Sequence, residues 1–171
     1  VLHGIWSWVS PENRDAIVEI LRRKLKVGGI AYVSYNANPG WAPAAPFRNL
    51  VALYAETEAA GANGVAARVD HALDSVRTLV DVGASYFRNT PSSISALGSI
   101  AQHDKNYVVH EYTSKDWHVM DFREVAQALR PAKLEFLTSA RTLDGIASLN
   151  LSADEQQLLS AVHDTATRQV T

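Results

Sequence analysis

The chain of 171 residues contains no cysteine and a single methionine. The lack of cysteine excludes a disulfide framework, a thiolate nucleophile and a cysteine-based zinc site. It also fits a reducing compartment, and we expect a cytoplasmic protein. Basic side chains are not in excess, because 16 Lys and Arg stand against 18 Asp and Glu, for a formal net charge of -2. Nucleic-acid binding normally shows as a basic patch, so we expect no nucleic-acid partner.

Long apolar runs are missing as well. No stretch approaches the roughly 20 apolar residues that span a bilayer, and the first residues lack a signal-peptide pattern, so we expect no membrane partner. With 47% hydrophobic and 20% charged residues, the composition is that of a globular domain with a real core. The chain has no initiator Met and its last helical pattern has no stop signal. We therefore expect an internal fragment, the alternative being a complete protein with frayed termini.

The first forty residues read as strand, helix and strand. Val1-Leu2 resembles the end of an apolar strand, and Ser10 before Pro11 is a helix N-cap followed by proline at the first helical position. Gly28-Gly29 ends that helix. Residues 30–35 are a short apolar run with β-branched and aromatic members, which is typical of a buried parallel strand. Three of the six prolines then fall within residues 36–46, which predicts an irregular loop.

The rest of the chain is mainly helical in pattern. Apolar residues at helical spacing predict helices that start at Pro46, Gly64 and Thr90-Pro91. Asp121 is placed to cap another helix, and Leu134, Phe136 and Leu137 indicate a strand. Ser152 with Glu155 three residues later is a capping-box pattern that opens a last helix running to Thr171.

Three separated motifs carry a family resemblance. They are HGIWSWVSPENRDAI at residues 3–17, LKVGGIAYVSYNANPGW at 25–41 and VVHEY at 108–112. In this order they resemble class I S-adenosylmethionine-dependent methyltransferases with a methyltransferase regulatory domain, whose relatives include rickettsial-type protein lysine methyltransferases. In that family the first motif stands at the fourth strand of the sheet, the second ends the fifth strand, and a helical segment with an HEY element follows.

The resemblance implies a helix-rich α/β fold, the C-terminal part of a Rossmann-like methyltransferase sheet with an inserted helical region. It implies that residues 1–44 end the catalytic core with strands 4 and 5, and that residues 45–118 form a helical regulatory or lid region. Residues 119–144 would return to the sheet as helix and strand, and 145–171 would begin a truncated helical segment. The implied function is the acceptor side of a methyltransferase, with protein lysine as the first candidate acceptor.

The cofactor that the resemblance implies is S-adenosylmethionine, yet its main binding loop is absent. The family binds the donor through a glycine-rich loop after the first strand and an acidic residue after the second, and this chain has neither. Gly28-Gly29 precedes a strand in the predicted order, so it is a helix-to-strand turn. We therefore expect the fragment alone to be inactive and to lack most of the cofactor site, with specific cofactor-binding residues unknown.

The candidate catalytic residues are His3, Tyr35 and Asn36. In the family order His3 follows the fourth strand, where it would act as a base or orient the acceptor; the alternative is a ring that hydrogen-bonds loop backbone. Tyr35 and Asn36 end the fifth strand and would border the acceptor pocket, where positioning supplies most of the rate. The turn formed by Asn38, Pro39 and Gly40 is explained by turn chemistry alone.

Six further residues are candidates for substrate binding. The aromatic ones could shield the reaction from water or hold a cationic acceptor by cation-π contact, with plain packing as the alternative. An HEY segment would pack over the acceptor pocket as part of a lid, with its Glu as an acceptor contact. A metal site is disfavoured, because adjacent His and Glu side chains diverge and no HExxH spacing exists. The six are Trp6, Trp8, Trp41, His110, Glu111 and Tyr112.

A second hypothesis comes from another functional class. The helical block at residues 45–104 would dock a partner and the α/β part would serve as scaffold, which makes the protein a non-enzymatic regulatory or interaction module. A dehydrogenase fragment ranks third, since the SYN-x-x-PGW motif has no evident role in hydride transfer. The oligomeric state is not predicted by any of these patterns. Three histidines on helical stretches beside charged residues, His71, His103 and His163, are expected to be solvated.

Overall fold

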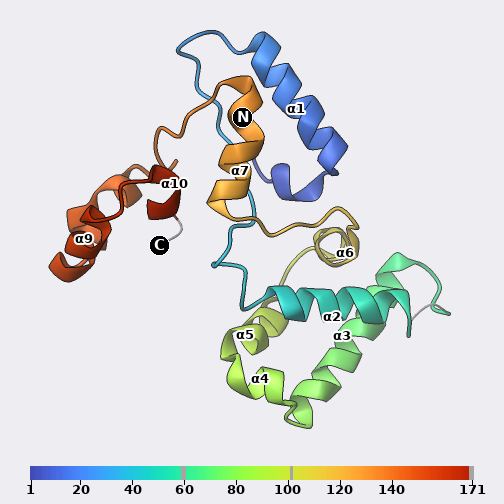
Figure 1. The fold of residues 1–171 in the computed structure, drawn as a ribbon. Coiled ribbons are helices and arrows are strands. Elements are labelled where there is room, and N and C mark those ends of the chain that lie inside the picture. Colours follow the sequence, from blue (N-terminus) through green and yellow to red (C-terminus); the bar gives the residue numbers. More distant parts are fainter. Residues whose placement is uncertain (59–60, 101, 170–171) are drawn as a thin grey trace. The chain divides into compact units, whose positions relative to one another are not determined.

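A computed structural model describes residues 1–58, 61–100 and 102–169. The chain divides into two compact units, which Figure 1 allows the reader to trace by colour. The first combines Val1–Asn38 with His118–Thr171, and the second is Pro39–Trp117. Each unit has its own buried cluster, so each is described by itself.

The first unit opens with a 3-10 turn, Trp6–Trp8, and helix α1, Pro11–Lys24. The Ser10 hydroxyl accepts a hydrogen bond from the Asn13 backbone N–H at 3.3 Å, which satisfies one of the free donors at the helix start. The predicted cap is therefore confirmed. The predicted stop at Gly28-Gly29 is a few residues late, because α1 ends at Lys24 with Leu25 as its C-cap. The glycines form a separate turn, in which Gly29 N–H donates to the Lys26 carbonyl at 2.8 Å and Gly28 has a φ of 80°.

The expected Rossmann-like sheet is wrong: the described residues contain no strand. Residues 1–2 and 30–35 meet only at a single parallel bridge, Leu2 with Val33, and Ala37 forms another with Met120. A strand needs pairing at successive residues, but Leu2 exchanges only two backbone hydrogen bonds, with Tyr32 and Ser34. The segment is not buried on both faces either, since Ile30 is 75% exposed. The apolar content of residues 30–35 therefore predicted a strand, but the backbone hydrogen bonds that would join it to a neighbouring strand are missing beyond a single bridge.

The predicted strand at residues 134–137 is wrong for the same reason. It is irregular in the structure, and Leu137 is 73% exposed. Helix α7, Phe122–Leu129, does form before it and is held by the capping box of Asp121 and Glu124, whose carboxylate accepts from the Asp121 backbone N–H at 2.7 Å. Turns Arg130–Ala132 and Thr142–Gly145 follow.

The C-terminal segment consists of short helices. They are α8, Ala147–Asn150, α9, Ala153–Ser160, and α10, Thr165–Arg168. The capping box at Ser152 is confirmed, because its hydroxyl accepts from Glu155 N–H and the Glu155 carboxylate accepts from Ser152 N–H. The predicted run to Thr171 is wrong, since α9 ends at Ser160; Thr171 itself lies outside the described residues. The small core of this unit is built on Trp6, Val18 and Val125.

The described residues of the second unit, Pro39–Trp117, form five helices, which Figure 1 shows clustered together. They are α2, Ala45–Glu56; α3, Val65–Asp81; α4, Ser85–Asn89; α5, Pro91–Ile100; and α6, Lys105–Thr113. The predicted 3.6-residue apolar spacing gives a buried face on each main helix, with Val51 of α2 and Val76 of α3 fully buried. Helices α2, α3 and α6 pack together around these residues.

A hydrogen-bonded cluster fixes the loop before α2. The Tyr86 hydroxyl donates to the Pro43 carbonyl at 2.7 Å and also contacts the hydroxyl of the buried Ser93 at 2.7 Å. Ser93 in turn donates to the same carbonyl at 3.1 Å. Residues from α4 and α5 thus hold the proline-rich loop that the sequence placed after residue 36, and Trp41 lies in that loop.

Candidate functional site

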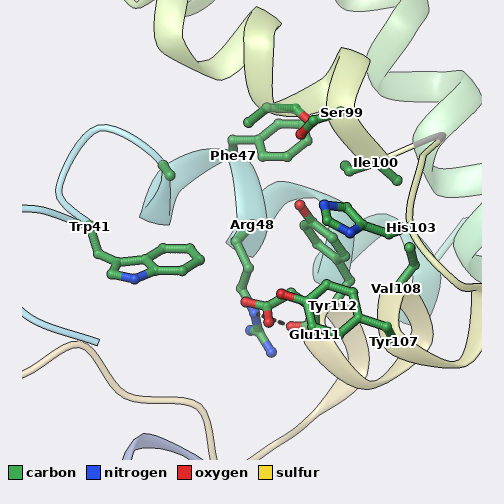
Figure 2. A pocket seen from close by; sticks show the side chains of 12 residues that line it. Trp41, Phe47, Arg48, Ser99, Ile100, His103, Tyr107, Val108, Glu111 and Tyr112 are labelled. Carbon is green, nitrogen blue, oxygen red and sulfur yellow. Dashed lines mark hydrogen bonds between the residues drawn. The ribbon is translucent and has the colours of Figure 1, made fainter. Parts of the chain in front are cut away.

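A pocket of about 160 Å³ lies within the helical unit, among α2, α5, α6 and the loop before α2 (Figure 2). That volume is smaller than the ~300–1,000 Å³ of sites for drug-sized ligands, so it suits one side chain. Its walls are largely aromatic and aliphatic, with one buried carboxylate and one buried guanidinium. The lining residues are Trp41, Ala44, Phe47, Arg48, Ala96, Ser99, Ile100, His103, Tyr107, Val108, Glu111 and Tyr112.

Arg48 enters from α2 and is only 7% exposed. Its Nε donates to the Glu111 carbonyl at 3.2 Å, and its Nη2 donates to the Ser114 carbonyl at 2.6 Å. The guanidinium carbon also lies 4.6 Å from the centre of the Trp117 ring, a cation-π contact. Burial lowers the pKa of Arg48 from its usual value, and nearby Glu111 opposes that shift. Arg48 thus joins α2 to the end of α6.

Glu111 supplies the carboxylate and is 6% exposed. Figure 2 shows its carboxyl group between the side chains of Arg48 and Tyr107. Burial raises the pKa of Glu111 above 4.5, although Arg48, the Tyr107 hydroxyl, the Trp117 indole and His110 act in the opposite direction. Its Oε1 has no hydrogen-bond partner, and neither has the indole Nε1 of Trp117.

Aromatic rings form the remaining wall in pairs. Trp41 meets Trp117 edge-on at a centroid distance of 5.5 Å, and Phe47 meets Tyr112 edge-on at 5.8 Å. The rings of His103 and Tyr107 are tilted to each other at a centroid distance of 5.0 Å. Burial raises the pKa of Tyr112 and also that of Tyr107, which is less completely buried. The nearby Glu111 adds to both shifts. Both phenols stay protonated and can donate hydrogen bonds at neutral pH.

The structure brings three predicted substrate-binding residues together in this pocket, Trp41, Glu111 and Tyr112. His110 does not line it and is exposed on α6, one residue before Glu111, as expected for adjacent side chains that diverge. The predicted lid role of the VVHEY segment is not tested. What the structure shows is a helix, α6, that supplies one wall of the pocket.

The other predicted residues belong to the first unit. The His3 ring is exposed, stacks near Tyr32 at 6.0 Å, and has its Nδ1 within 3.2 Å of the Tyr32 hydroxyl and 3.3 Å of the Ser34 hydroxyl. Tyr35 is half-buried, and burial together with Asp121 raises its pKa. The Asn36 backbone N–H donates to the buried Ser7 hydroxyl at 2.7 Å. The side-chain Nδ2 of Asn36 is buried and unpaired.

The two N-terminal tryptophans differ in exposure. Trp6 is fully buried in the core of the first unit with its indole Nε1 unpaired, so its ring is a packing residue. Trp8 is half-buried and is still a candidate for substrate contact. Ser7 between them joins this turn to Asn36, and the Ser7 carbonyl also accepts from the His118 backbone N–H at 2.9 Å.

Sequence reasoning missed the residues that organise the pocket. Arg48 appeared to be an ordinary helix cation, and Trp117 lay in an irregular segment with no motif. The one available signal in the sequence was the number of aromatic residues near the HEY segment, which pointed toward Trp117 and not toward Arg48. His103 was expected to be solvated, and it is exposed, but its ring also lines the pocket.

A second hollow of about 450 Å³ lies along α3 and the start of α6. Its charged residues are already paired with each other, since Lys105 contacts Asp70 at 2.6 Å and Arg77 contacts Asp74 at 2.6 Å. These pairs are exposed, where ion pairs contribute little. The larger hollow therefore presents no unpaired charged residue for a ligand, and the smaller pocket is the better candidate.

The residues present do not fit S-adenosylmethionine. A cofactor loop uses glycine where the backbone closely approaches its ligand. Gly4 and Gly28 have left-handed φ values of 61° and 80°, but neither lies in a glycine-rich loop between a strand and a helix. Nor do the described residues hold a group of three or more His, Asp or Glu that could bind a metal ion. No helix among these residues is long and apolar enough to cross a membrane.

Comparisons with known proteins identify relatives. Residues 104–171 match the family model described as a predicted methyltransferase regulatory domain. An uncharacterised Synechocystis protein is 39% identical over 99% of this chain and 33% of its own length. An uncharacterised protein of Rickettsia prowazekii is 24% identical over 96% of the chain and 29% of its own length. The chain thus spans about a third or less of the curated relatives it matches.

Solved structures show the same fold. PKMT2 from Rickettsia typhi superposes with a TM-score of 0.66 at 23% identity, over 99% of this chain and 31% of its own. PKMT2 in complex with AdoHcy superposes with a TM-score of 0.68 at 25% identity, over 98% of this chain and 31% of its own. The matched family region, residues 104–171, includes Tyr107, Glu111 and Tyr112 of the pocket.

Proposed function

Because this chain is related to the S-adenosylmethionine-dependent methyltransferases, we propose that it contributes the acceptor side of such an enzyme within a longer protein. The observation that carries the proposal is the match of residues 104–171 to a methyltransferase regulatory domain, supported by the likeness to PKMT2. Relatives about three times as long support the view that the chain is one part of an enzyme. The methyl donor would be held by segments other than the described ones.

We place the acceptor side chain in the pocket of the helical unit. Trp41, Glu111 and Tyr112 line a space of about 160 Å³, which suits a side chain and is too small for a nucleoside cofactor. Protein lysine is the first candidate acceptor, because a carboxylate and aromatic rings favour a cationic side chain. The acceptor would be a protein, with no role for nucleic acid or a membrane.

We assign orienting roles to the polar residues of the first unit. Asn36 has its backbone fixed by Ser7, and its buried side-chain amide has no partner, so a substrate would pair with this donor only after a local movement exposes it. His3 is exposed beside two hydroxyl groups, Tyr32 and Ser34, which hold one ring nitrogen and leave the other for a proton. Tyr35 stays protonated and would donate rather than accept a proton. A cytoplasmic location remains a prediction.

The donor-binding experiment tests this function directly. Isothermal titration with S-adenosylmethionine is performed on the longest gene product that contains this chain and on the 171-residue chain. We expect binding to the former and none to the latter. Micromolar binding by the 171-residue chain would contradict the division of the site, and the absence of binding and of methyl transfer in the longer product would contradict the function.

The second candidate function is a non-enzymatic interaction module. One observation favours it: the pocket among the described residues is built by the helical unit alone and is too small for a nucleoside cofactor. The module would bind a partner through the helical unit, with no methyl transfer by any longer product. The same donor titration separates the two functions, because a module has no affinity for the donor at any length.

A further inference from the structure

Ser7 is a buried polar residue to which the proposed function assigns no role. It is 1% exposed and lies in the 3-10 turn Trp6–Trp8, beside the fully buried Trp6. A hydroxyl group at such a site costs free energy unless it is hydrogen-bonded. The Ser7 hydroxyl accepts a hydrogen bond from the Asn36 backbone N–H at 2.7 Å, although 29 positions separate the two residues in the chain. The bond therefore depends on the tertiary fold and not on local sequence.

The backbone of Asn36 is held from both sides. Its N–H donates to Ser7, and its carbonyl accepts from the Met120 backbone N–H at 3.0 Å. The segments that supply these partners are themselves fixed. The Ser7 carbonyl accepts from the His118 N–H at 2.9 Å, and the Asn38 N–H donates to the Met120 carbonyl at 3.0 Å. Asn36 thus lies in irregular backbone, yet both of its main-chain groups are paired as they would be inside a sheet.

The side chain of Asn36 differs from its backbone. Its Nδ2 is buried and has no hydrogen-bond partner, so a substrate meets this donor only after a movement. The two backbone hydrogen bonds oppose a shift of the loop and leave rotation about the side-chain bonds as the available movement. A rotation keeps the Cα atom in place, so the amide reaches the same position each time. From these contacts we infer that Ser7 is a positioning residue, which holds the Asn36 backbone while the amide turns toward the substrate.

The role of Ser7 rests on the proposed function, because Asn36 is assigned there to orient the substrate. Ser7 acts through Asn36 and makes no substrate contact of its own. The alternative is a purely structural role, in which the Ser7 hydroxyl only pairs a buried backbone N–H. The two roles differ in one measurable respect. A positioning effect on the reaction disappears once the Asn36 side chain is removed, whereas a structural effect persists and adds to that removal.

A double-mutant cycle of Ser7→Ala and Asn36→Ala tests the role in the longest gene product that contains this chain. Methyl transfer is measured with tritiated S-adenosylmethionine and a heat-treated protein extract of the cells that carry the gene as acceptor. Initial rates at low extract concentration report kcat/KM for the acceptor, and calorimetry reports donor affinity. Ser10→Ala is the matched control, because the Ser10 hydroxyl also accepts from a backbone N–H of the first unit, that of Asn13.

We expect Ser7→Ala to lower the acceptor kcat/KM about three- to tenfold with donor affinity unchanged, the effect of one lost hydrogen bond. Asn36→Ala should lower it at least as much, and the double variant should match Asn36→Ala alone. Ser10→Ala should leave the rate unchanged and should multiply with neither variant. An unaltered rate in Ser7→Ala, or losses that multiply in the double variant, would overturn the inference.

A measurement on the unaltered 171-residue chain decides the matter when a variant fails to fold. Amide hydrogen exchange followed by NMR should show the Asn36 backbone N–H protected at least about tenfold relative to an unstructured peptide. An unprotected Asn36 N–H overturns the inference, because the backbone would then not be held.

The outcome is separable from that of the proposed function. Neither donor binding nor methyl transfer by the unaltered longer product refutes the function and, with it, the role of Ser7. Methyl transfer by the unaltered product with multiplied losses in the double variant refutes the role of Ser7 alone.

Discussion

Glu111→Gln should stabilise the helical unit at neutral pH, although it removes an ionised group from a predicted binding site. The side chain keeps its size and one carbonyl oxygen but loses its charge. In the folded chain burial raises the pKa of Glu111 above 4.5. This effect is larger than the opposing effects of four neighbours, Arg48, Tyr107, Trp117 and His110. Arg48 shows the matching effect, because burial lowers its pKa. Both shifts show that desolvation outweighs the mutual attraction.

The sign of the pH dependence follows from proton uptake. A folded-state pKa above the unfolded one means that the folded chain binds more protons between the two values, so its stability falls as the pH rises through that interval. Below pH 4.5 the carboxyl group is neutral in both states and the variant gains nothing. Above the folded-state pKa the full penalty of the charge applies to the wild type alone.

The structure limits the magnitude of this effect. Oε1 is the buried atom without a partner, and leaving such an atom unpaired costs about 1–3 kcal/mol. The attraction of Arg48 offsets part of this cost, and the glutamine amide itself lacks one partner. We expect a net gain on the order of 1 kcal/mol in the free energy of unfolding at pH 7.

Urea unfolding between pH 4 and pH 8 measures the difference, with the fluorescence or indole NMR signal of Trp117 reporting this unit. Glu56→Gln is the matched control and should follow the wild type at every pH. A variant that is less stable than the wild type at pH 7 would refute the reasoning, since attraction to Arg48 would then exceed desolvation. A gain that is independent of pH would refute it as well.

Further predictions concern the packing, capping and backbone of both units. Arg48→Ala leaves two carbonyl groups without their donor and should cost about 2–3 kcal/mol in urea unfolding, with Arg48→Lys losing less. Val76→Ala removes two methyl groups from a fully buried site and should cost about 2 kcal/mol by the same assay. Ser152→Ala removes a capping box and should cost about 1 kcal/mol locally, seen as faster amide hydrogen exchange in α9. Gly64→Ala should cost about 1–3 kcal/mol, because its φ of 93° strains any residue with a Cβ although the space is open. Full stability in any of these variants would contradict the contact concerned.

Local signals in the sequence predicted the helices well. Ser10, Asp121 and Ser152 each cap the helix that was expected, because a cap depends on the next three residues alone. The apolar spacing of α2 and α3 likewise identified their buried faces. The expected strands failed, because a strand depends on a partner that lies far away in the sequence, and residues 30–35 meet theirs at one position only.

The candidate site was predicted in part. Trp41, Glu111 and Tyr112 line one pocket, although they lie about seventy positions apart in the chain, and the family resemblance is what selected them together. Arg48 and Phe47 were not predicted, since their contribution arises from the packing of α2 on α6. Burial of a charged helix residue follows from tertiary contacts, and the sequence shows only an ordinary cation.

The bridge between Ala37 and Met120 places two distant points of the chain side by side. Asn38 N–H donates to the Met120 carbonyl and Met120 N–H donates to the Asn36 carbonyl, each at 3.0 Å. Neighbouring extended segments of this kind lie about 4.8 Å apart. The polypeptide therefore leaves the first unit and re-enters it at nearly the same place, so Pro39–Trp117 has the topology of an inserted domain. Its removal should be tolerated when a short glycine-containing turn joins residues 38 and 118. Insertions and deletions within the inserted unit can then arise in evolution without changing the path of the chain in the first unit.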